Sequence, residues 1–269
     1  MPTVKAGPIN IHYETSGDGP PLLLIMGYGM PGTAWLPMIP FLPGFRCICF
    51  DNRGTGESDR PEGPYTIPDM ADDASALLDA IGVARAKVYG ISMGGMIAQE
   101  LALRHPEKVE KLVLGCTTPG GASAKMAPPE LLERLVGAVK LAAREPERSV
   151  DTLMPLLYPS DVIAAHPEIR DMILATMRLG PPTPPETADR AMAGIGGFDA
   201  LDRLDRIRCP VLIVHGDKDL LLPPENALLL KSRIPHAELM MIPGAGHGYQ
   251  ASDPVGIHQR IVAWLNQRG

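Results

Sequence analysis

The chain has 269 residues, a length that fits one large domain or two small ones. Apolar residues make up 45% of it, which is enough to form a sizeable core. Its formal net charge of −6 argues against nucleic acid or an anionic membrane surface as a main partner. Residues 1–14 contain no apolar stretch of the kind found in a secretory leader, so a cytoplasmic location is expected.

Short apolar runs alternate with helical patterns along most of the chain. Several runs are continuous in Val, Ile and Leu, as is typical of strands buried on both faces of a parallel sheet. Strands are predicted at residues 9–14, 22–26, 45–51, 87–90, 111–116, 211–215 and 238–242. Helices are predicted at residues 68–81, 93–105, 224–234 and 254–266. This alternation predicts an α/β fold with a doubly wound, mostly parallel sheet.

The motif Gly90-Ile91-Ser92-Met93-Gly94 lies between a predicted strand and a predicted helix. Gly-x-Ser-x-Gly in this position is typical of a nucleophile elbow, a tight turn that exposes the serine hydroxyl. The flanking residues must be small, because a Cβ at either glycine would collide with the neighbouring strand or helix. Ser92 is therefore the candidate nucleophile. The alternative interpretation is a turn serine without a catalytic role.

The alternation stops at residues 118–203, where no strand is predicted. Helical patterns occupy residues 129–144, 149–157, 167–179 and 185–197, and prolines separate them. We interpret residues 118–203 as an inserted helical cap (lid) domain on a core domain formed by residues 1–117 and 204–269. Methionines of the cap are expected to be mostly packing residues, some of them lining a pliable apolar pocket. They include Met126, Met154, Met172, Met177 and Met192.

A serine hydroxyl is a poor nucleophile unless a base lies within hydrogen-bond reach and a carboxylate orients that base. In sheets of this type the order along the chain is Ser, then Asp or Glu, then His. After Ser92, a predicted strand runs into an acidic turn that carries Asp217 and Asp219, and His247 follows the last predicted strand. His215 ends its strand beside Asp219. We expect it to be structural, although a place in the site stays open.

All four cysteines lie in apolar runs and are expected to be small buried hydrophobic residues: Cys47, Cys49, Cys116 and Cys209. Cys47 and Cys49 are two residues apart in one predicted strand, so they face the same side and are poorly placed to bond to each other. No spacing of Cys and His suggests a zinc site. Neither a metal nor a cofactor is expected.

Further motifs accompany the elbow. They are Asp51-Asn52-Arg53-Gly54-Thr55-Gly56-Glu57-Ser58, Gly216-Asp217-Lys218-Asp219 leading to Pro223, and Gly246-His247. With these motifs the chain resembles the α/β-hydrolase fold family along nearly its whole length. In the family pattern Gly-x-x-Asp-x-x-x-Pro the acid stands three residues after the glycine, which implies Asp219 rather than Asp217. The motif from Asp51 to Ser58 is expected to shape a turn and not to take part in the chemistry.

The resemblance also implies an oxyanion hole made of two backbone N–H groups. One would come from Met93 and the other from Tyr28, in the loop after the strand at residues 22–26. Relatives usually carry His-Gly in that loop, whereas this chain has Met26-Gly27. Because the donor is a backbone amide, the hole is expected to survive the change. What supports the loop in place of that histidine is left open.

By resemblance the chain is a serine hydrolase that cleaves carboxylic esters of small to medium hydrophobic substrates through an acyl-enzyme. Ser92 attacks, His247 takes its proton, and Asp219 orients the histidine. The chain is similar to small bacterial carboxylesterases, to polyketide methylesterases and to 3-oxoadipate enol-lactonases. An enol-lactone hydrolase and a cofactor-free perhydrolase are therefore alternatives. Epoxide hydrolases and haloalkane dehalogenases are excluded, because they use Asp at the elbow.

Two other classes of function stay open. Some family members are ligand receptors with a slow or silent triad. A carbon–carbon bond hydrolase would need polar groups in the pocket to bind a dienol acid. The expected partner is a small-molecule ester, with no nucleic acid and no membrane, and whether the chain forms a homodimer is left open.

Overall fold

One eight-stranded sheet runs through the computed structural model, which describes residues 2–267. Its strands are β1 (Thr3–Ala6), β2 (Ile9–Ser16), β3 (Pro21–Ile25), β4 (Arg46–Phe50), β5 (Ala86–Ile91), β6 (Val109–Gly115), β7 (Val211–Gly216) and β8 (Glu238–Ile242). Their order across the sheet is β1-β2-β4-β3-β5-β6-β7-β8. The pairs β1–β2 and β2–β4 are antiparallel, and the pairs from β4 to β8 are parallel. The structure therefore confirms the α/β class and the mostly parallel sheet.

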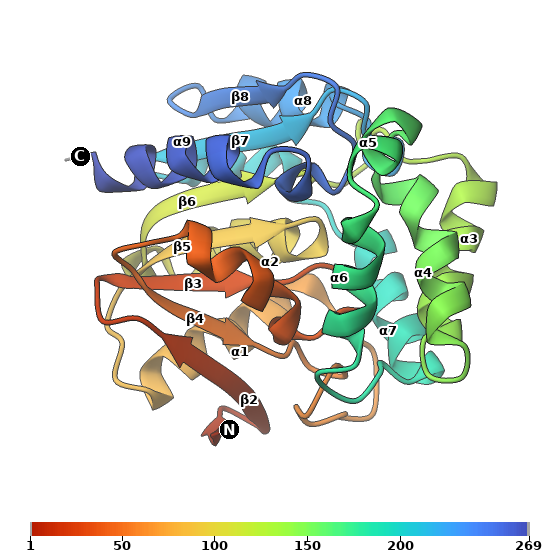
Figure 1. The fold of residues 1–269 in the computed structure, drawn as a ribbon. Coiled ribbons are helices and arrows are strands. Elements are labelled where there is room, and N and C mark those ends of the chain that lie inside the picture. Colours follow the sequence, from red (N-terminus) through yellow and green to blue (C-terminus); the bar gives the residue numbers. More distant parts are fainter. Residues whose placement is uncertain (1, 268–269) are drawn as a thin grey trace.

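Helices cover both faces of the sheet (Figure 1). One face packs against α1 (Ile67–Ala80), α2 (Met93–Arg104) and α8 (Glu225–Arg233), and the other packs against the 3-10 helix η1 (Gly32–Phe41) and α9 (Pro254–Asn266). Strand residues alternate between the two cores, because successive side chains of a strand point to opposite faces. Ile48 and Phe50 of β4 belong to the first core, whereas Cys47 and Cys49 belong to the second. This is the predicted doubly wound arrangement.

Every strand and helix expected from the sequence is present, with ends displaced by a few residues. The structure adds β1, η1 and a short helix at Ser160–Ala165, none of which was expected. The four cysteines are free, and Cys47, Cys49 and Cys116 are buried as expected. Cys209 is only half-buried, so the expectation of burial was wrong there. Within residues 2–267 no helix combines the length and the apolar character needed to cross a membrane.

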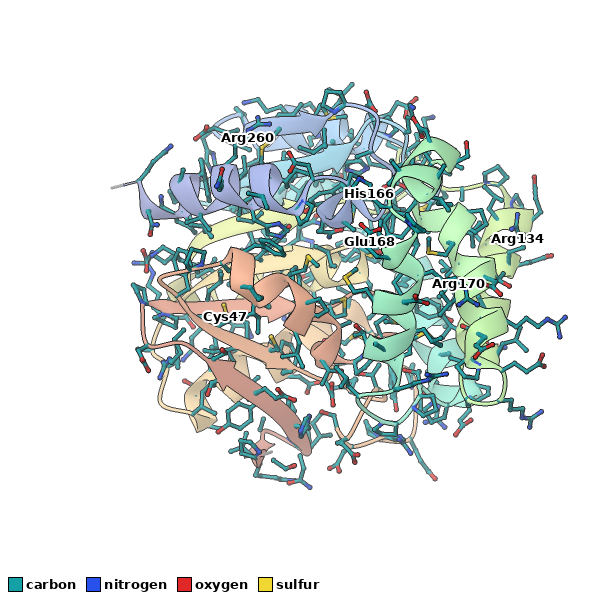
Figure 2. All side chains as sticks on the ribbon, in the orientation of Figure 1. Cys47, Arg134, His166, Glu168, Arg170 and Arg260 are labelled. Atoms are coloured by element: carbon teal, nitrogen blue, oxygen red, sulfur yellow. The ribbon has the colours of Figure 1, made fainter. Side chains whose placement is uncertain are left out.

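Helices fill the chain between β6 and β7. They are α3 (Pro129–Leu141), α4 (Pro146–Leu157), α5 (Ser160–Ala165), α6 (Glu168–Met177) and α7 (Pro185–Gly196). Figure 1 shows them beside the arrowheads of the strands, which mark the carboxyl edge of the sheet. Charged side chains of these helices, such as Arg134, Glu168 and Arg170, are labelled in Figure 2. Arg170 Nε donates to Asp151 Oδ1 at 2.7 Å, which joins α6 to α4.

The division into two domains stays a prediction. The ends of the helical segment meet at an isolated antiparallel bridge between Gly120 and Asp199. The predicted core domain includes residue 1 and residues 268–269, which lie outside the described residues. What the fold does establish is the position of the segment, whose helices α3, α4 and α6 supply walls of the pocket described next.

Candidate active site

Ser92 lies at the turn between β5 and α2, at the carboxyl edge of the sheet. Its backbone has φ of 55° and ψ of −124°, a conformation that is strained for a residue with a Cβ. Two hydrogen bonds hold the turn: the N–H of Ser92 donates to the carbonyl oxygen of Gly115 (2.9 Å), and Thr117 Oγ1 donates to the carbonyl oxygen of Ser92 (2.8 Å). The serine side chain is partly exposed and lines a pocket.

Glycines surround this turn for a steric reason. A Cβ at position 90 would overlap the carbonyl oxygen of Gly94, and a Cβ at position 94 would overlap the carbonyl oxygen of Ile25. Backbone atoms cannot move aside as a flexible side chain can, so both positions require glycine. A third glycine, Gly27, lies so close that its Cβ would be 3.0 Å from Ser92 Cβ. The loop after β3 therefore leaves space beside the serine hydroxyl.

His247 and Asp219 are in direct contact, as the sequence predicted. His247 lies in the loop after β8, and its Nδ1 is 2.8 Å from Asp219 Oδ2. The other carboxylate oxygen of Asp219 accepts the N–H groups of Leu221 and Leu222, each at 2.9 Å. Both side chains are buried. These contacts fix the carboxylate, and through it the orientation of the imidazole ring.

His215 adds a contact with Asp219 that the sequence left open. It is fully buried at the end of β7, and its Nε2 lies 2.7 Å from the carbonyl oxygen of Leu222 and 3.2 Å from Asp219 Oδ2. Because both neighbours are acceptors, the hydrogen is assigned to Nε2. His215 therefore holds the acid but does not line the pocket. Asp217 points elsewhere and accepts the N–H of Gly244 at 2.7 Å.

Asp219 is held in its ionised form. Burial by itself would raise its pKa, but the charge of His247 and the hydrogen bonds from His215 and His247 outweigh burial and keep the pKa well below its usual range. An ionised carboxylate beside Nδ1 keeps the ring hydrogen on that nitrogen, which leaves Nε2 free to accept a proton. The geometry of the pair is thus compatible with a base and its orienting acid.

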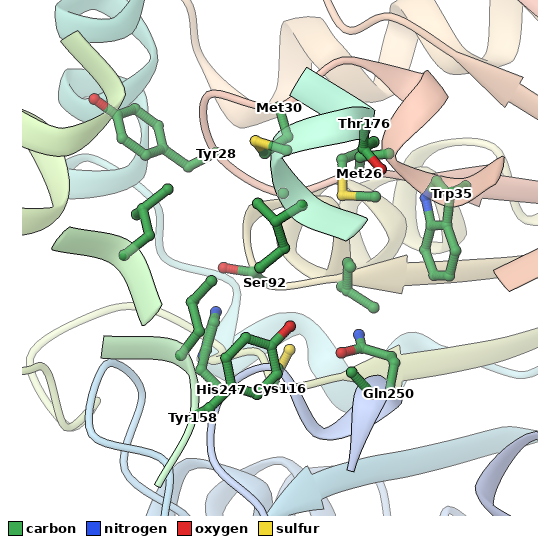
Figure 3. A pocket seen from close by; sticks show the side chains of 18 of the residues that line it. Met26, Tyr28, Met30, Trp35, Ser92, Cys116, Tyr158, Thr176, His247 and Gln250 are labelled. Atoms are coloured by element: carbon green, nitrogen blue, oxygen red, sulfur yellow. The ribbon is translucent and has the colours of Figure 1, made fainter. Parts of the chain in front are cut away.

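Ser92 and His247 line one predominantly apolar pocket of about 190 Å³ (Figure 3). Its walls come from α3, α4 and α6, from η1, and from the loops after β3 and β8. Within the described residues no hydrogen bond joins Ser92 to His247. Among the five methionines named in the segment, Met172 lines the pocket, whereas Met126 is exposed. Met154 and Met177 pack in an apolar cluster of the helical segment, and Met192 packs against the core on the α1, α2 and α8 side of the sheet.

The two expected oxyanion-hole donors, the N–H groups of Met93 and Tyr28, have no acceptor within the described residues. The Tyr28 side chain points away from Ser92 in Figure 3. The loop that carries Tyr28 is supported by Asn52, whose Nδ2 donates to the carbonyl oxygen of Met26 at 3.0 Å. This bond supports the loop, and the sequence alone does not reveal it.

Four further polar side chains line the pocket and were missed from the sequence: Trp35, Tyr158, Thr176 and Gln250. Gln250 follows His247 by three residues. This closeness in the sequence was the only indication that Gln250 lies at the pocket. Trp35, Tyr158 and Thr176 lie in segments without a motif, so only the folded structure shows that their side chains reach the pocket.

Comparison with known proteins gives consistent matches. A family model described as the alpha/beta hydrolase fold matches residues 20–254. A chain from Caulobacter sp. (strain K31), whose name of carbamate hydrolase RutD is provisional, is 31% identical and matches over 95% of this chain and 94% of its own length. The structure of a thermophilic esterase from Thermogutta terrifontis is 30% identical with a TM-score of 0.80, covering 98% of this chain and 96% of its own. The enol-lactonase from Burkholderia xenovorans LB400 is 26% identical with a TM-score of 0.83, covering 99% and 100%.

Proposed function

Because this chain belongs to the alpha/beta hydrolase fold family, we propose that it is a serine hydrolase that cleaves carboxylic esters through an acyl-enzyme. The observation that carries the proposal is the combination at one apolar pocket of a strained, partly exposed Ser92 and a His247 that is oriented by Asp219. The similarity to the esterase from Thermogutta terrifontis supports the same reaction class.

The mechanism follows from the positions of these groups. His247 Nε2 accepts the proton of Ser92 as the serine oxygen attacks the ester carbonyl carbon. The N–H groups of Met93 and Tyr28 stabilise the oxyanion. The alcohol leaves with the proton from His247, and water then attacks the acyl-enzyme with the same residue as base. The acid is released and the serine is restored, while Asp219 stabilises the imidazolium in both steps.

The pocket supports a hydrophobic substrate, since aliphatic side chains from α3, α4 and α6 form much of its wall. Each buried methylene of the substrate contributes at most about 0.8 kcal/mol. We propose that residues 118–203 act as a cap that excludes water from this pocket. A lactone is the second candidate substrate, favoured by the similarity to the enol-lactonase over the whole chain. Because a lactone is a cyclic ester, the same residues would open it.

The test of the proposal is the variant Ser92→Ala. Alanine fits the turn, so the fold should persist while kcat for p-nitrophenyl butanoate falls by about 10⁴-fold or more. A fluorophosphonate probe should label wild-type protein at Ser92, as peptide mass mapping would show. The exposed Ser123 provides the matched control, and Ser123→Ala should keep full activity and labelling.

Two outcomes would contradict the proposal in different ways. Activity close to wild type in purified Ser92→Ala would show that another group is the nucleophile. A single burst of p-nitrophenol without steady turnover would instead indicate a ligand receptor with a slow triad. Parallel assays on a lactone panel decide between the two substrate candidates.

A further inference from the structure

Two buried N–H groups of the pocket have no hydrogen-bond partner among residues 2–267. They are the indole Nε1 of Trp35, a residue only 1% exposed, and the side-chain Nε2 of Gln250, a residue 8% exposed. Both residues line the pocket with Ser92 and His247, and Figure 3 shows them on the same side of Ser92. Buried N–H groups nearly always have an acceptor, so two unpaired donors at one cavity need an explanation.

One buried aromatic cluster contains Trp35 and the residue that precedes Gln250. The ring of Trp35 packs against Tyr89 with ring centroids 4.9 Å apart. The hydroxyl groups of Tyr89 and Tyr249 are hydrogen-bonded at 2.7 Å, and both tyrosines are fully buried. Gln250 follows Tyr249 directly in the 3-10 helix η4 (Tyr249–Ala251). The cluster therefore packs directly against the indole of Trp35 and places the backbone of Gln250 at the same wall of the pocket.

The other polar side chains that line the pocket do not give a second pair of unpaired N–H donors. The hydroxyl of Thr176 donates to the carbonyl oxygen of Met172 at 2.8 Å. The buried hydroxyl of Tyr28 also has no partner among residues 2–267, but it points away from Ser92, and Tyr158 packs on Gly248 beside His247 (Figure 3). A tyrosine hydroxyl can also rotate its hydrogen, whereas an indole or amide hydrogen is fixed by its ring or amide plane.

We propose that Trp35 and Gln250 form a polar subsite that receives an oxygen acceptor on the substrate, separate from the ester group that Ser92 attacks. The inference rests on the proposed function and narrows the substrate to an ester with a second acceptor oxygen, such as a keto ester or an alkoxy ester. No Lys or Arg is among the residues that line the described pocket. Since a carboxylate would be buried there without a counter-charge, the acceptor is a neutral oxygen.

The first test compares pairs of esters that differ by one oxygen. On the acyl side these are p-nitrophenyl 5-oxohexanoate and p-nitrophenyl hexanoate, and on the alcohol side 2-ethoxyethyl butanoate and pentyl butanoate. A purely apolar pocket disfavours the oxygen, because the oxygen loses its water without gaining a donor. With the proposed subsite the oxygen gains a donor, so the oxygen-bearing ester becomes the better substrate. We expect its kcat/KM to be about tenfold higher than that of its partner in at least one pair. A ratio near or below one in both pairs overturns the proposal, whatever the variants do.

Variants then assign the preference to the two donors. Gln250→Leu and Trp35→Phe each remove an N–H and keep an apolar side chain in its place. In each variant the ratio of kcat/KM within the sensitive pair falls to about one or below. The exposed Gln259 on α9 gives the matched control, because Gln259→Leu makes the same chemical change on the surface and keeps the wild-type ratio. A preference that survives in both pocket variants overturns the assignment.

A binding measurement separates this proposal from the proposed function. Ser92→Ala protein leaves esters intact, so affinities for ethyl 5-oxohexanoate and ethyl hexanoate, and for the two butanoates, are measured on it by ligand-observed NMR. Tighter binding of an oxygen-bearing ester without hydrolysis by wild type supports the subsite and refutes the esterase. Hydrolysis by wild type with equal binding in both pairs supports the esterase and refutes the subsite.

Discussion

Asp219 receives hydrogen bonds from two backbone N–H groups and contacts two histidine rings. Asp217, two residues earlier, is exposed and bonds to the backbone of the neighbouring loop. A carboxylate at position 219 fixes the imidazole tautomer, and an amide there would favour the wrong one. The two aspartates therefore form a natural pair for separating an orienting role from a structural one.

Asp219→Asn should lower kcat for p-nitrophenyl butanoate by about 10⁴-fold, as expected when the base is held in the wrong tautomer. Asp217→Asn should lower it far less, because this carboxylate does not reach His247. Steady-state kinetics of both variants, with circular dichroism to check folding, measure the difference. If Asp217→Asn were the more damaging change, the two assignments would have to be exchanged.

The pKa of Asp219 also predicts how stability depends on pH. Because the folded-state pKa lies below the usual range, the unfolded chain binds the proton more readily, and stability rises with pH. The contribution is fully present above the unfolded pKa of about 3.9 and is lost as pH falls below it toward the folded pKa. Urea unfolding should therefore show a stability gap between wild type and Asp219→Asn that is largest near neutral pH and shrinks below about pH 4. A gap that widens on acidification would contradict this sign.

The resemblance to the family pattern Gly-x-x-Asp-x-x-x-Pro implied Asp219 rather than Asp217, and in the structure it is Asp219 that contacts His247. The contact from His215 could not be predicted in the same way. It depends on the direction in which the chain turns after β7, which places the carbonyl group of Leu222 and the carboxylate of Asp219 on one ring nitrogen.

At the scale of elements, the elbow between β5 and α2 leaves no room for a side chain at positions 90 and 94. Gly90→Ala would drive a Cβ into the carbonyl oxygen of Gly94, so we expect it to lower the free energy of unfolding by about 2 kcal/mol or more. Gly137 in α3 is the matched control, because a Cβ there would meet no heavy atom within 4 Å. Gly137→Ala should raise the free energy of unfolding by about 0.5–1 kcal/mol, as alanine favours a helix. Urea unfolding of both variants tests the contrast, and equal effects would contradict it.

Elements with a strong pattern were predictable, and those without one were not. The inner strands are continuous apolar runs because both faces are buried. By contrast, β1 has four residues and pairs with β2 through a tight turn at Gly7, so it shows too little alternation to be recognised. Helix α5 has six residues, too few for a helical period. The 3-10 helix η1 contains Pro37 and Pro40, which argue against a helix in the sequence.

At the scale of the whole molecule, the pocket depends on contacts between segments far apart in the chain. The cluster of Trp35, Tyr89 and Tyr249 joins η1, β5 and η4, and no local pattern reveals that these aromatic residues meet. The order of the strands was likewise not predicted, because the sequence shows which runs are buried but not which are neighbours. The elbow could be located from the sequence, while the polar subsite beside it required the folded structure.

The helical segment of residues 118–203 gives the pocket several of its apolar walls, so its side chains should influence which ester is cleaved best. Met172 of α6 lines the pocket, and Met172→Ala opens space there, so longer acyl chains can be buried. Each added methylene contributes at most about 0.8 kcal/mol, or roughly fourfold in kcat/KM. We expect the optimum among p-nitrophenyl esters to move to longer chains, with a smaller change for the acetate. Met126, 42% exposed, is the matched control, and Met126→Ala should leave the profile unchanged. An equal loss for acetate and long-chain esters in Met172→Ala would show that the segment supports folding and does not select the substrate.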